Sequence, residues 1–341
     1  MKYSRALIII LLMAGWAGVV ARPDKHDKKA AGPQIERVVA ADPNVSISVC
    51  VASGDITVRG WERNQIRART SDVSEIEFRK SGPSGSESAQ EITVVASNND
   101  RHQFGSCMAD ADIELDVPRG ATVKIQIRDG DVQVAEVSMV QAKTMNGDIS
   151  LEAIKRSTEA DTLSGNVSLK NSIGPARLHS VGGNISAIGV GPGSAGEVFE
   201  ASTVGGEVTL EKSGYAKVKA NSIGGELNIS GPLIAGGKYE LRTISGDIHL
   251  TLPAGSSFRL DARLSQNADF TSDFPLKITP DKERSNETPP QPPTPPRRRH
   301  GVPELPNGLP YGLKHLNAIY GTGDALLNIS SFSGSVYLQK K

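Results

Sequence analysis

The stretch Asn146-Gly147-Asp148-Ile149-Ser150-Leu151 holds the pattern that decides the fold: a glycine, then a polar residue, with apolar residues two and four positions after the glycine. Nine glycines stand in this setting, although at Gly183 the last apolar position is a small alanine. They are Gly54, Gly130, Gly147, Gly165, Gly183, Gly206, Gly225, Gly246 and Gly334. From Gly130 to Gly246, consecutive glycines are 17, 18, 18, 23, 19 and 21 residues apart. Such a near-constant period indicates stacked units that bury their apolar surface only against one another.

Residues at fixed offsets before the glycine extend the repeat. Serine or threonine stands three positions before it: Thr144, Thr162, Ser180, Thr203, Ser222 and Thr243. An apolar residue stands two positions before it: Met145, Leu163, Val181, Val204, Ile223 and Ile244. Alternating apolar and polar residues on both sides of the glycine predict two short strands per unit. We therefore predict an all-β fold, a parallel β-solenoid with coils of about 20 residues.

The glycine itself predicts a sharp corner, because glycine reaches positive φ without steric cost. We expect such a conformation, or another that is costly for other residues, at Gly147, Gly165, Gly206, Gly225 and Gly246. The Ser/Thr positions should then form one column with Cα atoms about 4.8 Å apart. The longer step between Gly183 and Gly206 predicts a loop that bulges outward at residues 189–196.

The chain divides into six segments. Residues 1–21 have the layout of a signal peptide, with a positive start, a 15-residue apolar run and Val19-Val20-Ala21 as the cleavage site. A retained anchor is the alternative, although the run is shorter than the ~20 residues of a membrane-spanning helix. The other segments are a disordered lead-in (22–33), an N-terminal β region (34–118), the solenoid (119–279), a disordered Pro/Arg-rich insert (280–312), and a last coil with a C-terminal strand that closes the structure (313–341).

Six runs with period-two alternation predict the strands of the N-terminal β region. They are Val45–Val49, Ile56–Val58, Ile66–Thr70, Ile76–Phe78, Glu91–Val95 and Ile113–Val117.

Composition narrows the classes of partner. The 38 basic residues balance the 38 acidic ones, so charge does not direct the chain to nucleic acid or to an anionic membrane. Aromatic residues make up only 4%, which weakens the case for sugar stacking. The two cysteines of an exported chain, Cys50 and Cys107, predict one disulfide, with two buried thiols as the alternative.

A signal peptide, the stretch Ser53-Gly54-Asp55-Ile56-Thr57-Val58-Arg59-Gly60-Trp61 and the serial Gly-Asp-Ile-x-Leu corners together resemble the bacterial "putative adhesin" domain of unknown function. The resemblance covers roughly residues 43–338, and the Pro/Arg-rich insert departs from it. It implies a right-handed β-solenoid in the periplasm, at the outer-membrane surface or outside the cell. It brings no catalytic residues to this chain.

The residues after the corner glycines form the strongest candidate for a metal site. Stacked oxygen ligands suit Ca²⁺, and the column consists of Asp131, Asp148, Asn166, Asn184, Glu207, Glu226 and Asp247. The calcium-binding Gly-Gly-x-Gly-x-Asp pattern is absent, so turn residues that face solvent or bond nearby amides are the favoured interpretation, and calcium stays open. The histidines are interpreted as surface or structural groups: His26, His102, His179, His249, His300 and His315. We expect no cofactor and no catalytic residue.

These observations predict a non-enzymatic binding, adhesion or structural module of the cell envelope. Outward rows of residues such as Thr209, Asn228 and His249 would contact an envelope protein or polymer. The alternatives are a polysaccharide-active enzyme, which needs paired carboxylates, and an envelope-stress or signalling accessory protein. Arg297-Arg298-Arg299 is interpreted as part of a solvated linker rather than an interaction tether. The oligomeric state stays open.

Overall fold

The computed structural model describes residues 34–73, 75–81, 89–97, 107, 109–279 and 314–341, and within these ranges the regular elements are all β-strands. The described residues belong to one unit that spans Pro33–Lys341. The predicted signal peptide, the lead-in and the Pro/Arg-rich insert lie outside the described residues.

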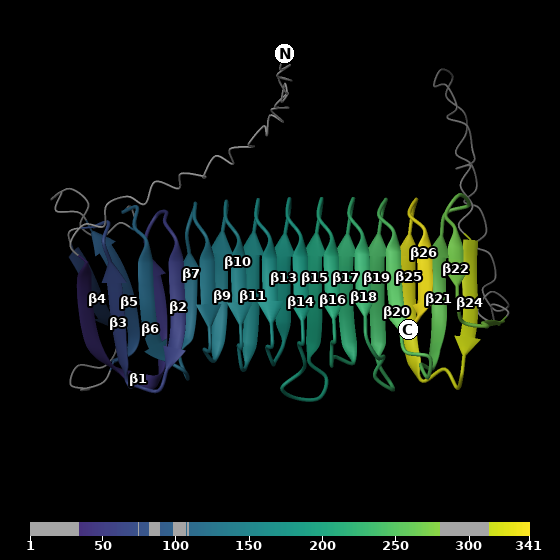
Figure 1. The fold of residues 1–341 in the computed structure, drawn as a ribbon, viewed down its shortest axis with the longest axis horizontal. Helices are drawn as coiled ribbons and strands as arrows, with labels where there is room; N and C mark the ends of the chain where they lie inside the picture. Colours follow the sequence, from purple (N-terminus) through teal and green to yellow (C-terminus); the bar gives the residue numbers. More distant parts are fainter. Residues whose placement is uncertain (1–33, 74, 82–88, 98–106, 108, 280–313) are drawn as a thin grey trace, which may run out of the picture. The chain divides into compact units, whose positions relative to one another are not determined.

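Each coil of the stack contributes one short strand to each of two sheets, which we call sheet A and sheet B (Figure 1). In spatial order, sheet A contains the first part of β1 (Ile35–Cys50), then β3 (Gln65–Thr70), with which it pairs antiparallel, β6 (Ile113–Pro118), β2 (Ile56–Trp61), β8 (Val132–Ala135), β10 (Ile149–Glu152), β12 (Val167–Lys170), β14 (Ile185–Ile188), β16 (Val208–Glu211), β18 (Leu227–Ser230), β20 (Ile248–Leu252), β26 (Val336–Lys340) and β22 (Phe270–Ser272).

Sheet B contains β4 (Glu75–Ser81), β5 (Ala89–Ser97), β1 (Ile35–Cys50), β7 (Thr122–Gln126), β9 (Met139–Thr144), β11 (Ser157–Thr162), β13 (Ala176–Ser180), β15 (Val198–Thr203), β17 (Lys217–Ser222), β19 (Lys238–Thr243), β25 (Ala325–Ser331), β21 (Phe258–Leu264), β24 (Lys314–Tyr320) and β23 (Lys277–Ile278). Neighbouring coils pair in parallel, so the predicted all-β solenoid is confirmed. The six strands predicted from the N-terminal region are confirmed as well, because each lies within one of β1 to β6.

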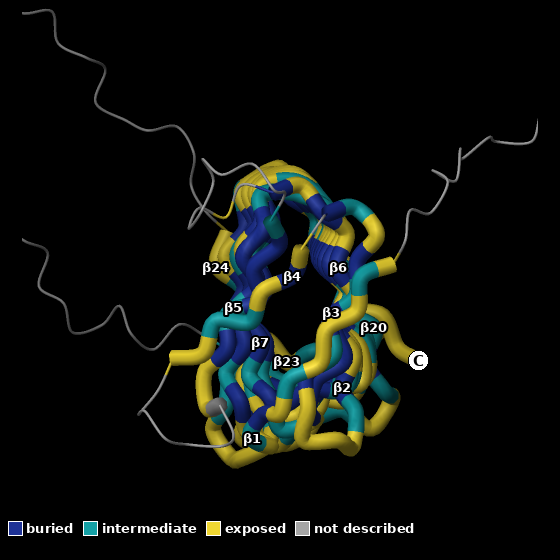
Figure 2. The backbone as a smooth tube through the Cα atoms, turned by 90° about the vertical axis from the view of Figure 1, so that its left-hand side faces the viewer, coloured by how far each residue is buried: buried dark blue, intermediate teal, exposed yellow. Residues whose placement is uncertain are grey.

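The core lies between the two sheets. Along β10 the residues alternate between buried and exposed, with Ile149 and Leu151 inside. The same positions of the next coil, Val167 and Leu169, pair with them directly. Figure 2 looks along the stack and shows the buried positions on the inner side of both sheets. Each coil therefore buries its apolar residues against the coils before and after it, as the repeat predicts.

The predicted Ser/Thr column is confirmed. Thr162 pairs with both Thr144 and Ser180, and Ser222 pairs with both Thr203 and Thr243. These side chains are buried, and all but Thr243 donate to the corner glycine carbonyl of the preceding coil. The Thr203 hydroxyl accepts a bond from the Gly206 amide of its own coil (3.2 Å) and donates to the Gly183 carbonyl of the preceding coil (2.9 Å).

The expectation of positive φ is met at Gly147 but not at Gly165, Gly206, Gly225 or Gly246, and the alternative, another conformation costly for other residues, stays a prediction. Only Gly54, Gly130 and Gly147 have φ in the left-handed region, at 123°, 130° and 146°. The positions outside that region are Gly165, Gly183, Gly206, Gly225, Gly246 and Gly334.

Glycine is needed at the corner because the coils approach one another too closely for a side chain. A Cβ atom on any of the nine glycines would lie closer than 3.0 Å to the backbone carbonyl of the stacked residue in the neighbouring coil, a separation that real Cβ atoms do not reach. Ala111 occupies this position in the coil of β5 and β6 and supplies the carbonyl beneath Gly54. Because no further parallel coil lies beneath this one in the described stack, no neighbouring carbonyl excludes the Cβ of Ala111.

Positive φ occurs instead at the opposite corner, directly after the strands of sheet A. The residues there are Glu136 (59°), Ala153 (55°), Asn171 (49°), Gly189 (66°), Lys212 (51°) and Gly231 (138°). Their backbone amides donate to the next coil; that of Ala153, for example, donates to the Lys170 carbonyl (3.0 Å). The chain that follows Gly189 forms the widest loop at this corner (Figure 1), where the sequence predicts an outward bulge.

The C-terminal coil does not end the stack, so the expectation that the last strand closes the structure is wrong. β25 pairs with β19 on one side and with β21 on the other, and β26 lies in the same way between β20 and β22. The chain therefore returns to fill a place between two earlier layers. Antiparallel β24 and β23 cover the outer edge of sheet B.

The N-terminal end is interleaved in a similar way. The coil of β1 and β2 lies between the coil of β5 and β6 and the coil of β7 and β8. A disulfide between Cys50 and Cys107, whose Cα atoms are 4.8 Å apart, joins the β1–β2 coil to the segment that leads into β6. Parallel pairing thus continues across residue 118, where the sequence predicts a boundary.

Candidate binding surfaces

The acidic column after the corner glycines is a hydrogen-bond ladder between coils. The Asp131 carboxylate accepts from the Asp148 backbone amide (2.8 Å), and the Asp148 carboxylate accepts from the amide of Asn166 (2.7 Å). The Asn166 side chain accepts from the amide of Asn184 in turn (2.9 Å). An Asp or Asn side chain has the length that this contact needs. The column therefore links successive coils by hydrogen bonds, a role that does not require a metal.

Glu207 interrupts the ladder, because its longer side chain turns to other partners. Its carboxylate accepts from the Thr209 hydroxyl (2.6 Å) and from the Asn228 amide (2.7 Å). These two bonds hold the pKa of Glu207 below its ordinary value. In the part of the chain that the structure describes, no group of three or more His, Cys, Asp or Glu side chains is arranged to hold a metal ion.

The described histidines are spread over the two sheets. The ring of His249 stacks on Tyr337 on sheet A, with centroids 4.7 Å apart and planes at 6°. His315 contacts Asp261 on sheet B (3.0 Å), and His179 lies on the same sheet in β13. His26, His102 and His300 lie outside the described residues.

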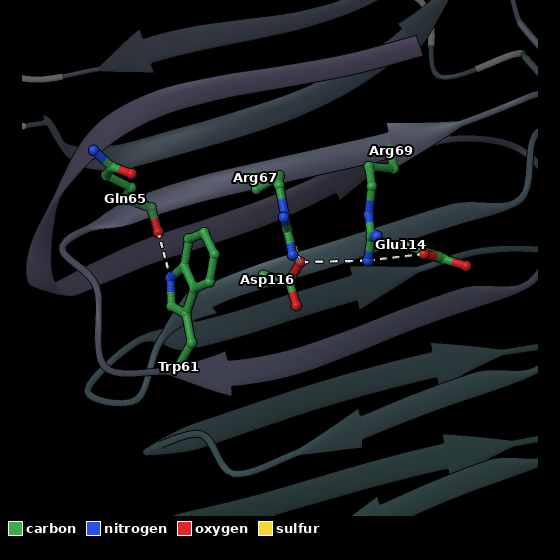
Figure 3. Close-up of polar contacts among 6 residues, drawn as sticks. All are labelled: Trp61, Gln65, Arg67, Arg69, Glu114 and Asp116. Carbon is green, nitrogen blue, oxygen red and sulfur yellow. Dashed lines mark hydrogen bonds and ion pairs between the residues drawn. The ribbon is translucent and has the colours of Figure 1, made fainter. Parts of the chain in front are cut away.

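A cluster of charged residues holds β3 against β6 near one end of sheet A (Figure 3). The Asp116 carboxylate, only 12% exposed, accepts two bonds from Arg67 (2.9 and 2.7 Å) and a longer one from Arg69 (3.4 Å). The Trp61 indole donates to the Gln65 carbonyl (2.8 Å), and the Arg67 guanidinium lies 5.1 Å from its ring centre. Since Arg67 and Asp116 are paired in the antiparallel register of β3 and β6, the cluster anchors this strand.

The outer face of sheet B is charged, and several of its charges are paired with one another. Lys143 contacts Asp161 (2.9 Å) and Glu159 (3.3 Å), which raise the pKa of its amino group. Lys238 contacts Glu240 (2.7 Å), and this bond lowers the pKa of the carboxylate. Ion pairs of this exposed kind contribute little stability, but a partner that binds there would have to compete with them.

The outer face of sheet A carries a row of mostly uncharged polar residues. The predicted outward residues Thr209, Asn228 and His249 are stacked in register. The row extends in both directions and consists of Thr57, Gln133, Ser150, Ser168, Ser186, Thr209, Asn228, His249 and Tyr337. A shallow groove of about 240 Å³ runs along its first half, with Arg59, Glu152 and Lys170 on the other side.

The structure also shows a feature that the sequence analysis missed, an exposed apolar ridge along the glycine corner. It consists of the residues two positions before the glycine: Met145, Leu163, Val181, Val204, Ile223, Ile244 and Phe332. Six of the seven are large side chains at least 40% exposed, and Val181 is half-buried. The sequence does contain a signal for this ridge. Successive side chains of a strand point to opposite faces, so the residue after a buried Ser/Thr points outward.

The described strands form a β-solenoid whose repeated motif allows the coils to stack. On its outer faces, side chains at equivalent positions of successive coils form long, regular rows. The chain belongs to the family described as Toastrack DUF4097, whose sequence profile matches residues 44–290.

Several solved bacterial structures, each described as a "putative adhesin", are similar to this chain. One, a "putative adhesin" from Parabacteroides merdae, is 12% identical, with 65% of this chain and 91% of that chain covered and a TM-score of 0.43. Its counterpart from Parabacteroides distasonis is 11% identical with the same coverage and a TM-score of 0.40. One from Bacteroides fragilis is 8% identical, with 90% and 97% covered and a TM-score of 0.28. No curated protein matches the sequence. Within the described ranges no helix is long and apolar enough to cross a membrane.

Proposed function

We propose that this protein is a non-enzymatic binding module that acts outside the cytoplasm and holds an extended partner on the outer face of sheet A. The observation that carries the proposal is the row of uncharged polar side chains on that face. Its members recur once per coil, at the ~4.8 Å spacing of paired strands. Such a row suits a partner whose own donors and acceptors repeat, either an envelope polymer or an extended protein segment.

The polar side chains of the two outer faces differ in their bonding, and this difference favours sheet A as the binding face. The hydroxyls of Ser150, Ser168 and Ser186 make no side-chain hydrogen bond with another described residue, so they are available to a partner. On sheet B a partner would have to separate or desolvate ion pairs such as Lys143–Asp161, which costs free energy. Uncharged hydroxyls lose less on desolvation and can then bond the partner.

Two features support a location outside the cytoplasm. The N-terminal segment is predicted to be a signal peptide, and the structure joins Cys50 and Cys107 in a disulfide, a bond that is rare in the cytosol. Binding rather than catalysis is supported by the ladder carboxylates, which are engaged by backbone amides of the next coil.

The proposal is tested with the mature chain and a double substitution in the row. In Ser168→Glu with Ser186→Glu, two adjacent hydroxyls become charges, and retention of the chain on cell-envelope extracts should be abolished. The matched control is Ser157→Glu, a serine on the outer side of sheet B, which should bind as the unchanged chain does. All variants should keep the same melting temperature.

Two outcomes would contradict the proposal. If the double variant is retained on the extract as well as the control, sheet A is not the binding face. If the purified chain degrades an envelope polysaccharide and loses this activity when one carboxylate is changed, the protein is an enzyme.

A further inference from the structure

A groove runs beside the C-terminal half of the apolar ridge, on the side of sheet B. Its apolar wall consists of Val204, Ile223, Ile244 and Phe332, whose side chains are 40, 47, 51 and 54% exposed. Its floor is the buried Ser/Thr column, and its volume is about 370 Å³. Monomeric proteins rarely expose contiguous large apolar side chains without a binding role.

The other wall of the groove carries two arginines on either side of a serine. Arg242 of β19 pairs in register with Ser330 of β25, and Ser330 pairs with Arg263 of β21. Two guanidinium groups therefore stand on the strands that flank one hydroxyl. This juxtaposition arises only because the C-terminal coil is inserted between β19 and β21.

Both arginines keep donors that a ligand can use. Their side chains are 68 and 65% exposed, and each lies 3.8 Å from the nearest carboxylate. Those carboxylates have closer partners: Lys238 lies 2.7 Å from Glu240, and His315 lies 3.0 Å from Asp261. The groove thus has a cationic end and an apolar wall.

The dimensions favour a single hydrocarbon chain over a peptide. The two walls are two residues apart on the same strands, about 7 Å, which leaves room for one chain. The apolar residues repeat at ~4.8 Å, whereas the side chains on one face of an extended peptide repeat at ~7 Å. A hydrocarbon chain has no side-chain period to match, and the three steps from Phe332 to Val204 offer it about 14 Å of apolar wall.

We propose that this groove binds a single-chain anionic lipid, with its phosphate between Arg242 and Arg263 over the Ser330 hydroxyl and its hydrocarbon chain along Phe332, Ile244, Ile223 and Val204. Arginine donates paired bonds to phosphate oxygens, and the tetrahedral group accepts from several directions at once. The site lies at the glycine corner on the side of sheet B, so it is separate from the row of sheet A and does not depend on that row.

The test uses calorimetric titration of the mature chain with myristoyl lysophosphatidate below its micellar concentration. We expect one lipid per chain. Arg242→Gln with Arg263→Gln should weaken binding about tenfold or more, because two charge-assisted contacts are lost. The control Arg177→Gln with Lys219→Gln removes the same charge from the same sheet outside the groove and should leave the affinity unchanged.

The apolar wall is tested separately. Ile223→Asn with Ile244→Asn should also weaken binding about tenfold or more, since each buried methylene contributes to the affinity of a lipid chain. Ile173→Asn, an equally exposed isoleucine away from the ridge, is the matched control and should have no effect. Because the substituted residues are exposed, all variants should keep the melting temperature of the unchanged chain.

Three results would overturn the proposal. In the first, tetradecyltrimethylammonium, a cation with the same chain length, binds as well as the lysophosphatidate. In the second, neither double variant changes the affinity. In the third, the lipid-free chain forms a dimer that Ile223→Asn with Ile244→Asn abolishes, which would show that a second copy covers the ridge. None of these results would alter retention on envelope extracts through sheet A.

Discussion

The two corners of each coil reverse the chain in different ways. At the corner before each sheet A strand, glycine is required although its φ is mostly outside the left-handed region, because the carbonyl of the neighbouring coil lies where a Cβ would be. At the opposite corner, Glu136, Ala153 and Lys212 adopt φ of 51–59° although none of them is glycine. Left-handed conformation costs such residues roughly 1–2 kcal/mol each, and the bond from each amide to the next coil offsets part of this cost.

A repeated glycine thus marks close approach between coils, whereas a left-handed backbone conformation alone does not require one residue type. A Cβ in contact with a backbone carbonyl cannot be relieved by a change of rotamer, so glycine is the one residue that fits. A left-handed residue with free space around its side chain can be almost any residue. The glycine corner is therefore periodic in sequence, and the opposite corner is not.

The largest expected effect is at the N-terminal end of the stack, where Ala111 stands in place of the corner glycine. There the Cys50–Cys107 disulfide joins two coils. The cysteines are 57 residues apart in sequence. Closing a loop of this length stabilises the fold by about 4 kcal/mol in the entropic model. Cys50→Ser with Cys107→Ser should lower the free energy of unfolding by up to that amount, as measured by denaturant unfolding.

The bond itself is checked by labelling free thiols in the denatured, non-reduced mature chain. Two reactive thiols per chain would reject the disulfide and would leave the coil of β1 and β2 held by its strand pairs alone.

The second prediction separates close approach from backbone conformation within one dipeptide. Gly206→Ala places a Cβ against the Gly183 carbonyl and should destabilise the protein by about 3 kcal/mol or more, since the coils must move apart. The neighbouring Gly205→Ala is the matched control, because its Cβ would have no atom closer than 3.8 Å. It should leave the unfolding midpoint unchanged or raise it slightly. Equal midpoints for the two variants would refute our account of the glycine corner.

The third prediction addresses the opposite corner. Lys212→Gly should raise the free energy of unfolding by about 0.5–1 kcal/mol, because relief of left-handed strain outweighs the added chain entropy. Gly189→Ala, at the same corner with φ of 66°, should lower it by about 1 kcal/mol. Thermal unfolding of both variants checks the sign. If Lys212→Gly is the less stable protein, strain at this corner is smaller than the φ value indicates.

The smallest expected effect is at Glu207, where the ladder is interrupted. Bonds from Thr209 and Asn228 lower the pKa of its carboxylate, so the folded state favours the ionised form. This contribution is fully present above the ordinary pKa of 4.5 and is lost as the pH falls through the lowered folded value. Glu207→Gln should therefore be less stable than the unchanged chain near neutral pH, by less than about 1 kcal/mol after solvent screening. The difference should shrink below pH 4.5.

Thermal unfolding at a series of pH values measures this effect. Glu152→Gln, on the outer face of the same sheet, controls for loss of charge alone. A stability difference that stays constant through the acid range would show that the bonds to Thr209 and Asn228 do not favour the ionised carboxylate.

Much of the stack could be predicted from the sequence because its order is local and repeated. The Ser/Thr column follows from a fixed offset to the glycine, and the outward positions of Thr209, Asn228 and His249 follow from strand alternation. The same alternation contains the apolar ridge, but Met145 and its counterparts read as core residues when apolar character is taken to mean burial. The cationic end of the lipid groove has no sequence signal, since Arg242, Arg263 and Ser330 meet only across strands that are distant in the chain.

The repeated motif is enough to predict the parallel coils, their approximate length, the glycine corner and the column of hydroxyls beside it, because each of these recurs once per coil. The reason that glycine is needed, and the order in which the end coils stack, become visible only in the folded chain. The glycine requirement depends on a carbonyl in another coil, about 20 residues away. The repeat does not specify the order at the ends because each coil presents a parallel strand edge on both sides, and the coil of β25 and β26 pairs in parallel with β19 and β20 on one side and with β21 and β22 on the other.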